Sequence, residues 1–160
     1  MVMKNTTCRR RRFCFGLAGL LLVGGLTSCT GFAGAWRKAA ETEVRRKDAL
    51  SGRWVGEWES RRNSHQGSLR CVVTPSSGQA AGEPGDYEFH FHATWAGFLS
   101  GSWKITCPVD RKDGEWQFGG SHDLGWGVGV YQFDGQVISG RFRADYNGKG
   151  DQGWFELSRP

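Results

Sequence analysis

The segment Asp86-Tyr87-Glu88-Phe89-His90-Phe91-His92 decides the fold, because aromatic and polar side chains alternate strictly along it. Successive side chains of a β-strand point to opposite faces of the sheet. The pattern therefore predicts a strand over 86–95 with one buried aromatic face. Helical spacing of apolar residues, every three or four positions, is not found here.

The same alternation continues on both sides of this segment and predicts seven further strands. They are expected at 52–60, 67–74, 102–109, 115–122, 128–133, 136–146 and 152–157. Between them stand turn-forming stretches, and Asp134-Gly135 and Asn147-Gly148 are strong hairpin signals. Short strands joined mostly by hairpins predict an all-β domain over 51–160, an eight-stranded antiparallel up-and-down barrel without exposed edges. A two-sheet β-sandwich is the alternative.

The N-terminus has the layout of a secretory signal peptide. A basic segment with four consecutive arginines, Arg9 to Arg12, precedes an apolar run over 13–26. At about 1.5 Å per residue that run spans roughly 21 Å, too short for the roughly 30 Å hydrocarbon core of a bilayer. We therefore expect a cleaved leader rather than a membrane-spanning helix.

Leu26-Thr27-Ser28-Cys29 follows the apolar run and resembles the lipobox of bacterial lipoproteins. The resemblance implies that residues 1–28 are removed and that Cys29 carries a diacylglycerol thioether and an N-acyl chain, enough acyl surface for stable anchoring. Thr30, in place of an Asp, implies the outer membrane. The expected location is the bacterial cell envelope, with the protein facing the periplasm and the membrane as its partner through Cys29.

Removal of the leader changes the charge and the cysteine content. The chain has 21 Lys and Arg against 16 Asp and Glu, and five of the cationic residues lie in the leader. The mature protein is therefore neutral, which argues against a nucleic-acid partner. Of the cysteines outside the leader and the anchor, Cys71 and Cys107 could form a disulfide in an oxidising compartment. Strands two and four of a meander lie about 9–10 Å apart, which argues against that bond.

We expect residues 29–50 to comprise the lipidated Cys29 and a tether that links it to the barrel domain. Glu41/Arg45 and Glu43/Lys47 are spaced for helix-stabilising ion pairs, but the apolar stripe is thin. We expect a solvated, partly helical tether; the alternative is a helix that lies on lipid headgroups through Trp36.

Gly52-Arg53-Trp54 opens the first strand and resembles the G-x-W motif of the calycins, the lipocalin and avidin group. The resemblance implies that Trp54 closes one barrel end and that an arginine near the last strands packs across it. Arg141, Arg143 and Arg159 are the candidates.

Fourteen aromatic side chains are expected inside the barrel, which predicts a mostly filled interior with any ligand near an open rim. They are Trp54, Trp58, Tyr87, Phe89, Phe91, Trp95, Trp103, Trp116, Phe118, Tyr131, Phe133, Phe142, Tyr146 and Phe155. A glycine-rich segment over 119–129 is the candidate rim. The candidate ligand-binding residues are Trp54, Trp58, Trp95, Trp103, His122, Asp123 and Trp126.

No catalytic residue, metal site or cofactor is expected. His122 and Asp123 point to opposite strand faces, and Glu88, His90 and His92 are expected on the solvent side. No phosphate loop or nucleophile motif is present. The sequence therefore predicts non-enzymatic binding of a small apolar or aromatic ligand; the alternative is a structural or protein-interaction role in the envelope, with a filled barrel.

Overall fold

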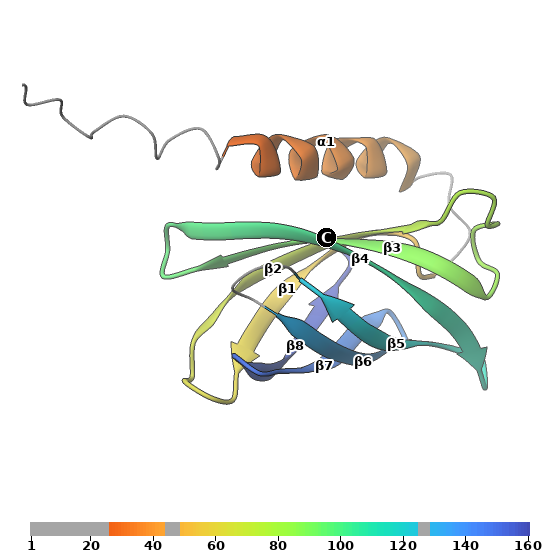
Figure 1. Cartoon of the computed structure of the whole chain (residues 1–160). Coiled ribbons are helices and arrows are strands. Elements are labelled where there is room, and N and C mark those ends of the chain that lie inside the picture. The colour runs from red at the N-terminus through yellow and green to blue at the C-terminus, as the bar shows by residue number, and fades with distance from the viewer. Residues whose placement is uncertain (1–25, 44–48, 125–128) are drawn as a thin grey trace, which may run out of the picture.

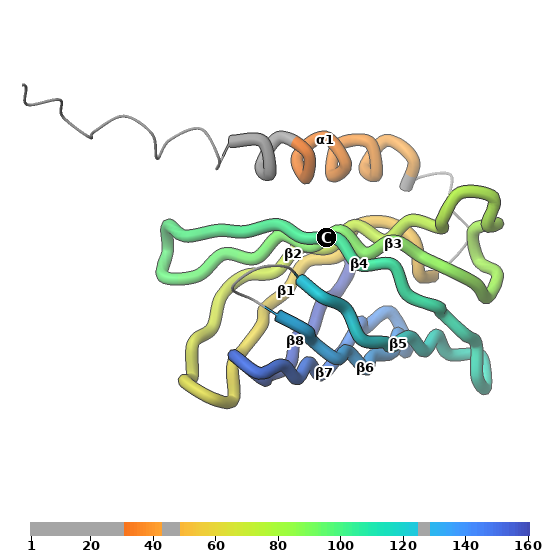
Figure 2. Tube along the Cα trace, viewed as in Figure 1, coloured from red at the N-terminus to blue at the C-terminus, as the bar shows by residue number. Residues whose placement is uncertain are grey.

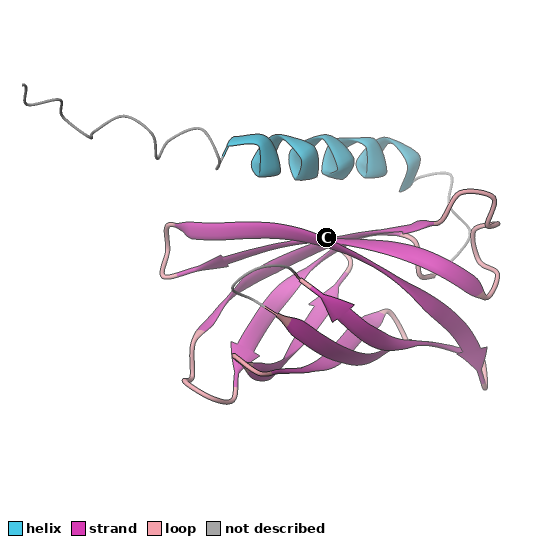
Figure 3. Cartoon of the chain, viewed as in Figure 1, coloured by secondary structure: helices cyan, strands magenta, loops and turns pink. Residues whose placement is uncertain are grey.

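The computed structural model describes residues 26–43, 49–124 and 129–160 (Figure 2). These residues form one helix and a closed barrel of eight antiparallel strands (Figures 1 and 3). The elements in chain order are α1 (Leu26–Glu43), β1 (Gly52–Ser60), β2 (Gln66–Pro75), β3 (Gly85–Trp95), β4 (Leu99–Lys112), β5 (Glu115–Asp123), β6 (Val130–Ile138), β7 (Arg141–Gly148) and β8 (Gln152–Ser158).

The barrel closes because β1 pairs with both β2 and β8. Its pairing with β8 runs from Val55 opposite Ser158 to Ser60 opposite Gly153. Each remaining strand pairs with its sequence neighbours. The predicted all-β up-and-down barrel is confirmed, and the sandwich alternative is wrong.

One predicted turn is wrong. Asp134-Gly135 lies inside β6, and the chain turns instead at Ser139-Gly140, where both φ angles are positive (50° and 78°) as in a tight hairpin turn. Gly135 serves close packing: a Cβ there would lie 2.4 Å from the Phe118 ring and 2.7 Å from the Ala144 Cβ.

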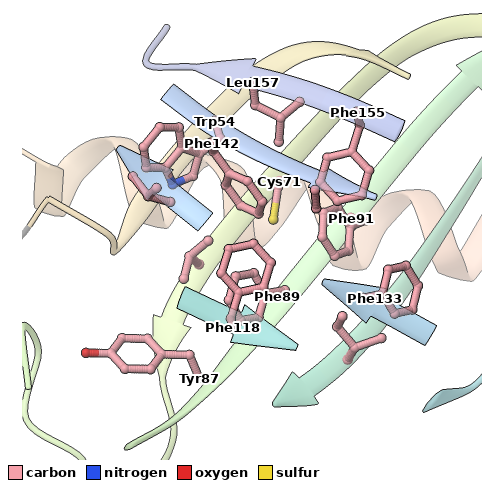
Figure 4. Close-up of a cluster of buried hydrophobic side chains, with 14 of the residues drawn as sticks. Trp54, Cys71, Tyr87, Phe89, Phe91, Phe118, Phe133, Phe142, Phe155 and Leu157 are labelled. Atoms are coloured by element: carbon pink, nitrogen blue, oxygen red, sulfur yellow. The ribbon is translucent and has the colours of Figure 1, made fainter. Parts of the chain in front are cut away.

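The predicted inward face is confirmed for all fourteen aromatic side chains, which belong to one core cluster. The rings of Trp54, Phe89, Phe118 and Phe142 pack with centroid separations of 4.9–6.0 Å (Figure 4). These side chains are at most 5% exposed. They fill the half of the barrel that contains the start of β1 and the end of β8, which we call the closed end.

Arg159 seals the closed end. Its guanidinium carbon lies 3.9 Å from the centroid of the Trp54 ring, and it donates hydrogen bonds to the carbonyls of Arg53 and Ala49. The Trp54 indole N–H donates to the Leu50 carbonyl at 2.9 Å. Of the three candidate arginines, Arg159 therefore packs on Trp54. Arg141 and Arg143 instead pair with Glu156.

Helix α1 packs on the outside of the barrel (Figure 1). The helical character expected for the tether is therefore confirmed up to Glu43, but the expectation that this segment is solvated is wrong. Phe32 and Ala39 are buried in a small cluster with Val72 of β2. Trp36 lies under two guanidinium groups, with Arg53 at 5.2 Å and Arg70 at 5.6 Å from its ring centroid. The Arg45 and Lys47 partners of the predicted ion pairs lie outside the described residues. No helix in the described part is both long and apolar enough to cross a membrane.

Candidate functional site

The other end of the barrel, which we call the open end, contains a pocket of about 510 Å³. Seven of the eight strands contribute to its wall, and β5 contributes through Leu124, which follows it. It is lined by Trp58, His65, Leu69, Ala93, Trp95, Gly101, Ser102, Trp103, Leu124, Tyr131, Phe133, Tyr146, Asp151 and Phe155.

The pocket exists because the aromatic side chains do not fill the open half. Trp58, Trp95, Trp103, Tyr131 and Tyr146 are only partly buried, although all pack against the core. Trp103 stacks on Phe91 at 5.4 Å, and Tyr131 lies 6.1 Å from Tyr146 between ring centroids. The floor of the pocket is therefore the packed aromatic core. The pocket walls present the faces and edges of aromatic rings toward the space above this floor.

The barrel wall is incomplete beside this pocket. Pairing between β4 and β5 is confined to Val109–Lys112 with Glu115–Phe118. The preceding residue of β4, Pro108, has no backbone N–H to donate to a neighbouring strand. Nearer the rim β4 pairs with β3 and β5 pairs with β6, so Trp103 and Leu124 line the pocket from strands that are not joined there.

Two buried nitrogen atoms at this end lack a hydrogen-bond partner among the described residues: Nε1 of Trp103 and Nε2 of His122. His122 lies on the inward face of β5 with its ring 6.2 Å from Phe133, a pocket residue. A buried polar group without a partner costs about 1–3 kcal/mol. The site therefore holds hydrogen-bonding capacity that the described protein atoms leave unused.

The Asp151 carboxylate connects the polar groups at the rim of the pocket by hydrogen bonds. Asp151 accepts hydrogen bonds from the Ser60 hydroxyl, from the Tyr146 hydroxyl at 3.1 Å and from the Gln152 N–H. Burial, followed by the nearby Asp151 charge, raises the pKa of Tyr146 and of Tyr131. Both phenols are thus neutral hydrogen-bonding groups at physiological pH.

The structure brings together some of the predicted ligand-binding residues and separates others. Trp58, Trp95 and Trp103 line the pocket. Trp54 is fully buried at the closed end, away from the pocket. His122 lies beside the pocket, Asp123 is exposed on the opposite strand face, and Trp126 lies outside the described residues, as does the side chain of Cys29.

Tyr131, Tyr146 and Asp151 are pocket residues that the sequence analysis did not select. Both tyrosines alternate in phase with buried aromatic residues, so their inward direction was predictable, but their closeness to the rim was not. Asp151 follows the glycine-containing turn after β7, and its hydrogen bond to Ser60 joins residues 91 positions apart. No local pattern signals such a contact.

Cys71 and Cys107 are both free and buried in the structure. They stand opposite Phe91 and Tyr87 of the intervening strand β3, four residues apart, so the register keeps them separate. Burial, followed by the Asp86 charge, raises the pKa of Cys107 to about 12, and burial raises that of Cys71 as well. Neither thiol is activated for nucleophilic chemistry.

The predicted solvent-side placement of His90 is wrong, because α1 covers it. His90 is 6% exposed, and the ring of Phe32 lies 5.0 Å from both His90, edge-on, and His92, stacked. Burial is the main cause that lowers the pKa of both histidines. For His90 the positive charge of Lys104 also lowers it and Glu88 opposes this; for His92 the second cause is Arg70. Among the described residues, no three potential metal-ligating His, Cys, Asp or Glu side chains gather.

No protein-family model matches the chain, and no curated protein and no solved structure shows significant similarity to it.

Packing of α1 is expected to depend on pH. The pKa of His90 and of His92 is below the usual 6.5 when Phe32 covers them, so the undocked state binds more protons. Docking should be fully stable above pH 6.5 and weaken as the pH falls below it. Hydrogen exchange of the α1 amides, corrected for intrinsic rates, should show less protection at pH 5 than at pH 7.5.

The double variant His90→Gln/His92→Gln is the control for this measurement, because it removes both titrating groups. In this variant the hydrogen-exchange protection of the α1 amides should change little between pH 5 and pH 7.5. Equal protection of wild-type α1 at pH 5 and pH 7.5 would contradict the prediction.

Proposed function

We propose that this chain is a lipid-anchored envelope protein whose barrel binds a small apolar or aromatic molecule at its open end, without catalysing a reaction. The observation that carries the proposal is the pocket of about 510 Å³ above an aromatic floor. Sites for small molecules are typically concave, mostly apolar spaces of about 300–1,000 Å³ with a few placed polar groups. Both the size and the lining of this pocket fit that description.

The rings that line the pocket narrow the ligand chemistry. Trp95, Trp103 and Tyr131 offer rings for stacking in offset or edge-on geometry. We therefore propose a flat aromatic or short alkyl ligand.

The closed end supports a calycin-like assignment of the barrel. Trp54 of the G-x-W motif plugs that end, and Arg159, which follows the last strand, covers the ring at 3.9 Å. This is the arrangement that the resemblance implies. A barrel sealed at one end and hollow at the other is also the form suited to holding one small ligand.

The anchor at Cys29 is compatible with the position of α1. A cut before Cys29 would leave the docking face of the helix, Phe32 to Ala39, intact. The first residues of the mature chain would then belong to a helix that packs on the barrel. The domain would therefore be held close to the membrane, without a long flexible linker.

Gly101 gives a direct test of the pocket. A Cβ at Gly101 would meet Trp95 at 3.4 Å, an ordinary contact, and would point into the pocket. Gly101→Leu should therefore fill part of the pocket without unfolding the barrel. The probe N-phenyl-1-naphthylamine should bind the wild-type protein with a rise in its fluorescence, and the variant should bind it at least about tenfold more weakly, about 1.4 kcal/mol.

Ser100→Leu is the matched control, because Ser100 is the preceding residue and lies exposed on the outer face. It should bind the probe like the wild type. Equal affinity of all three proteins, or no binding by the wild type, would contradict ligand binding in this pocket and favour the structural role.

Replacement of the anchor residue tests the lipid attachment. Cys29→Ala removes the thiol that would carry the diacylglycerol, so the variant should leave the membrane fraction of lysed cells and lose the corresponding acyl mass. If Cys29→Ala fractionates with membranes as the wild type does, lipidation at Cys29 is wrong.

A further inference from the structure

The exposed large apolar side chains of the described residues gather at the open end. Phe98 is 82% exposed, Val130 53% and Leu99 43%. Phe98 and Leu99 form the tip of the β3–β4 hairpin, and Val130 is the first residue of β6, on the same rim. Exposed apolar groups that cluster at one place on a soluble surface mark a contact with another surface.

The hairpin tip projects beyond the rest of the barrel. Pairing of β3 with β4 continues to Trp95 opposite Leu99, whereas pairing of β2 with β3 ends at Leu69 opposite Ala93. The last paired residues of the hairpin are therefore not paired with β2, and Figure 1 shows the β3–β4 hairpin standing apart from the other open-end turns. The sequence over 94–101, TWAGFLSG, has no charged residue.

Helix α1 begins at this same end. Phe32 packs on His92, near the end of β3 that leads to the tip, whereas the chain after α1 reaches the closed end, where Ala49 accepts a hydrogen bond from Arg159. In Figure 1 the first turn of α1 and the hairpin tip lie on the same side of the barrel. Cys29 precedes Phe32 by three residues, about 4.5 Å along a helix.

We propose that the open end of the barrel lies against the lipid bilayer, with Phe98 and Leu99 among the headgroups and the pocket mouth facing the membrane. This rests on the lipid anchor proposed above. The bilayer is the occupant that the arrangement favours, because the anchor, the uncharged tip and the mouth share one end. The ligand then passes between bilayer and pocket without crossing water.

Two apolar side chains alone hold a protein on a membrane only weakly, because even a single acyl chain gives marginal binding. A lipid on Cys29 makes the contact intramolecular and raises the effective concentration of the tip at the surface. Anchor and tip are therefore complementary: the first holds the protein, and the second orients it.

A fluorophore on the tip tests this orientation. Ala96→Cys labelled with a nitrobenzoxadiazole group leaves Phe98 and Leu99 in place, and the native Cys71 and Cys107 are buried. Asp113→Cys is the matched control at the closed end, because Ala96 and Asp113 are both exposed turn residues with positive φ, each followed by a glycine. The lipidated proteins are reconstituted in vesicles of phosphatidylethanolamine and phosphatidylglycerol.

The label at residue 96 should shift its emission to the blue and lose intensity when the vesicles contain doxyl-labelled lipid, and the label at residue 113 should do neither. Adding Phe98→Asp/Leu99→Asp to Ala96→Cys should abolish both effects. Identical, water-like emission at the two positions would overturn the proposal. So would a blue shift at residue 96 that occurs in native membranes but not in protein-free vesicles, because it would indicate a protein partner.

A second tether separates failure of the docking from failure of the anchor. The labelled chains are also prepared with a hexahistidine tag in place of residues 1–29, so that no Cys29 thiol remains to take the label, and are bound to vesicles that contain nickel-chelating lipid. If Cys29 carries no lipid, this experiment still measures whether the tip enters the bilayer. A blue-shifted, lipid-quenched label at residue 96 would support membrane docking of the tip and would contradict only the lipid anchor. Water-like emission from the label at residue 96 in this experiment would contradict membrane docking of the tip.

Discussion

The pairing of β1 with β8 is the constraint on which the rest of this structure depends. It converts a meander into a tube of fixed width, so every inward side chain competes for one enclosed volume. Trp54, Phe89, Phe118 and Phe142 occupy the closed half completely. Toward the rim the rings stand apart, and inward glycine and alanine replace larger residues at Gly101 and Ala93. The same closure thus produces both a solid core and a pocket above it.

Much of the fold could be predicted from period-two alternation, because that pattern is a direct consequence of strand geometry. It predicted the bounds of β1, as observed, and the inward direction of the fourteen aromatic side chains that belong to the core cluster. The alternation gives the right strand at 130–138, and the prediction is wrong there because the Asp134-Gly135 turn motif was given more weight than the alternation. Asp134-Gly135 suggests a turn, yet Phe133, Gly135 and Val137 continue one inward face of a single strand, and Gly135 is there because the Phe118 ring leaves no room for a Cβ.

The parts that could not be predicted depend on contacts between distant segments. Packing of α1 needs Phe32, Val72 and His92 to meet, and these come from three elements. A clue was present in the run Cys71-Val72-Val73, because Val72 breaks the alternation by being apolar on an outer face. For the site, three of the candidate tryptophans line the pocket, but Trp54 belongs to the opposite end. Alternation fixes which face a side chain occupies; its height along the barrel follows from the pairing register.

The first turn of α1, which contains the proposed anchor residue Cys29, lies at the same end as the apolar hairpin tip and the pocket mouth. Trp54 and Arg159 close the other end. Ligand binding at the open end requires that the pocket be an accessible space in the folded protein. Xenon enters apolar cavities of proteins, so xenon-129 magnetic resonance of the dissolved gas measures it directly. We expect the xenon signal to shift with the concentration of the wild-type protein and to shift less with Gly101→Leu. Equal shifts for both proteins, at the level given by nonspecific surface contact, would contradict this expectation.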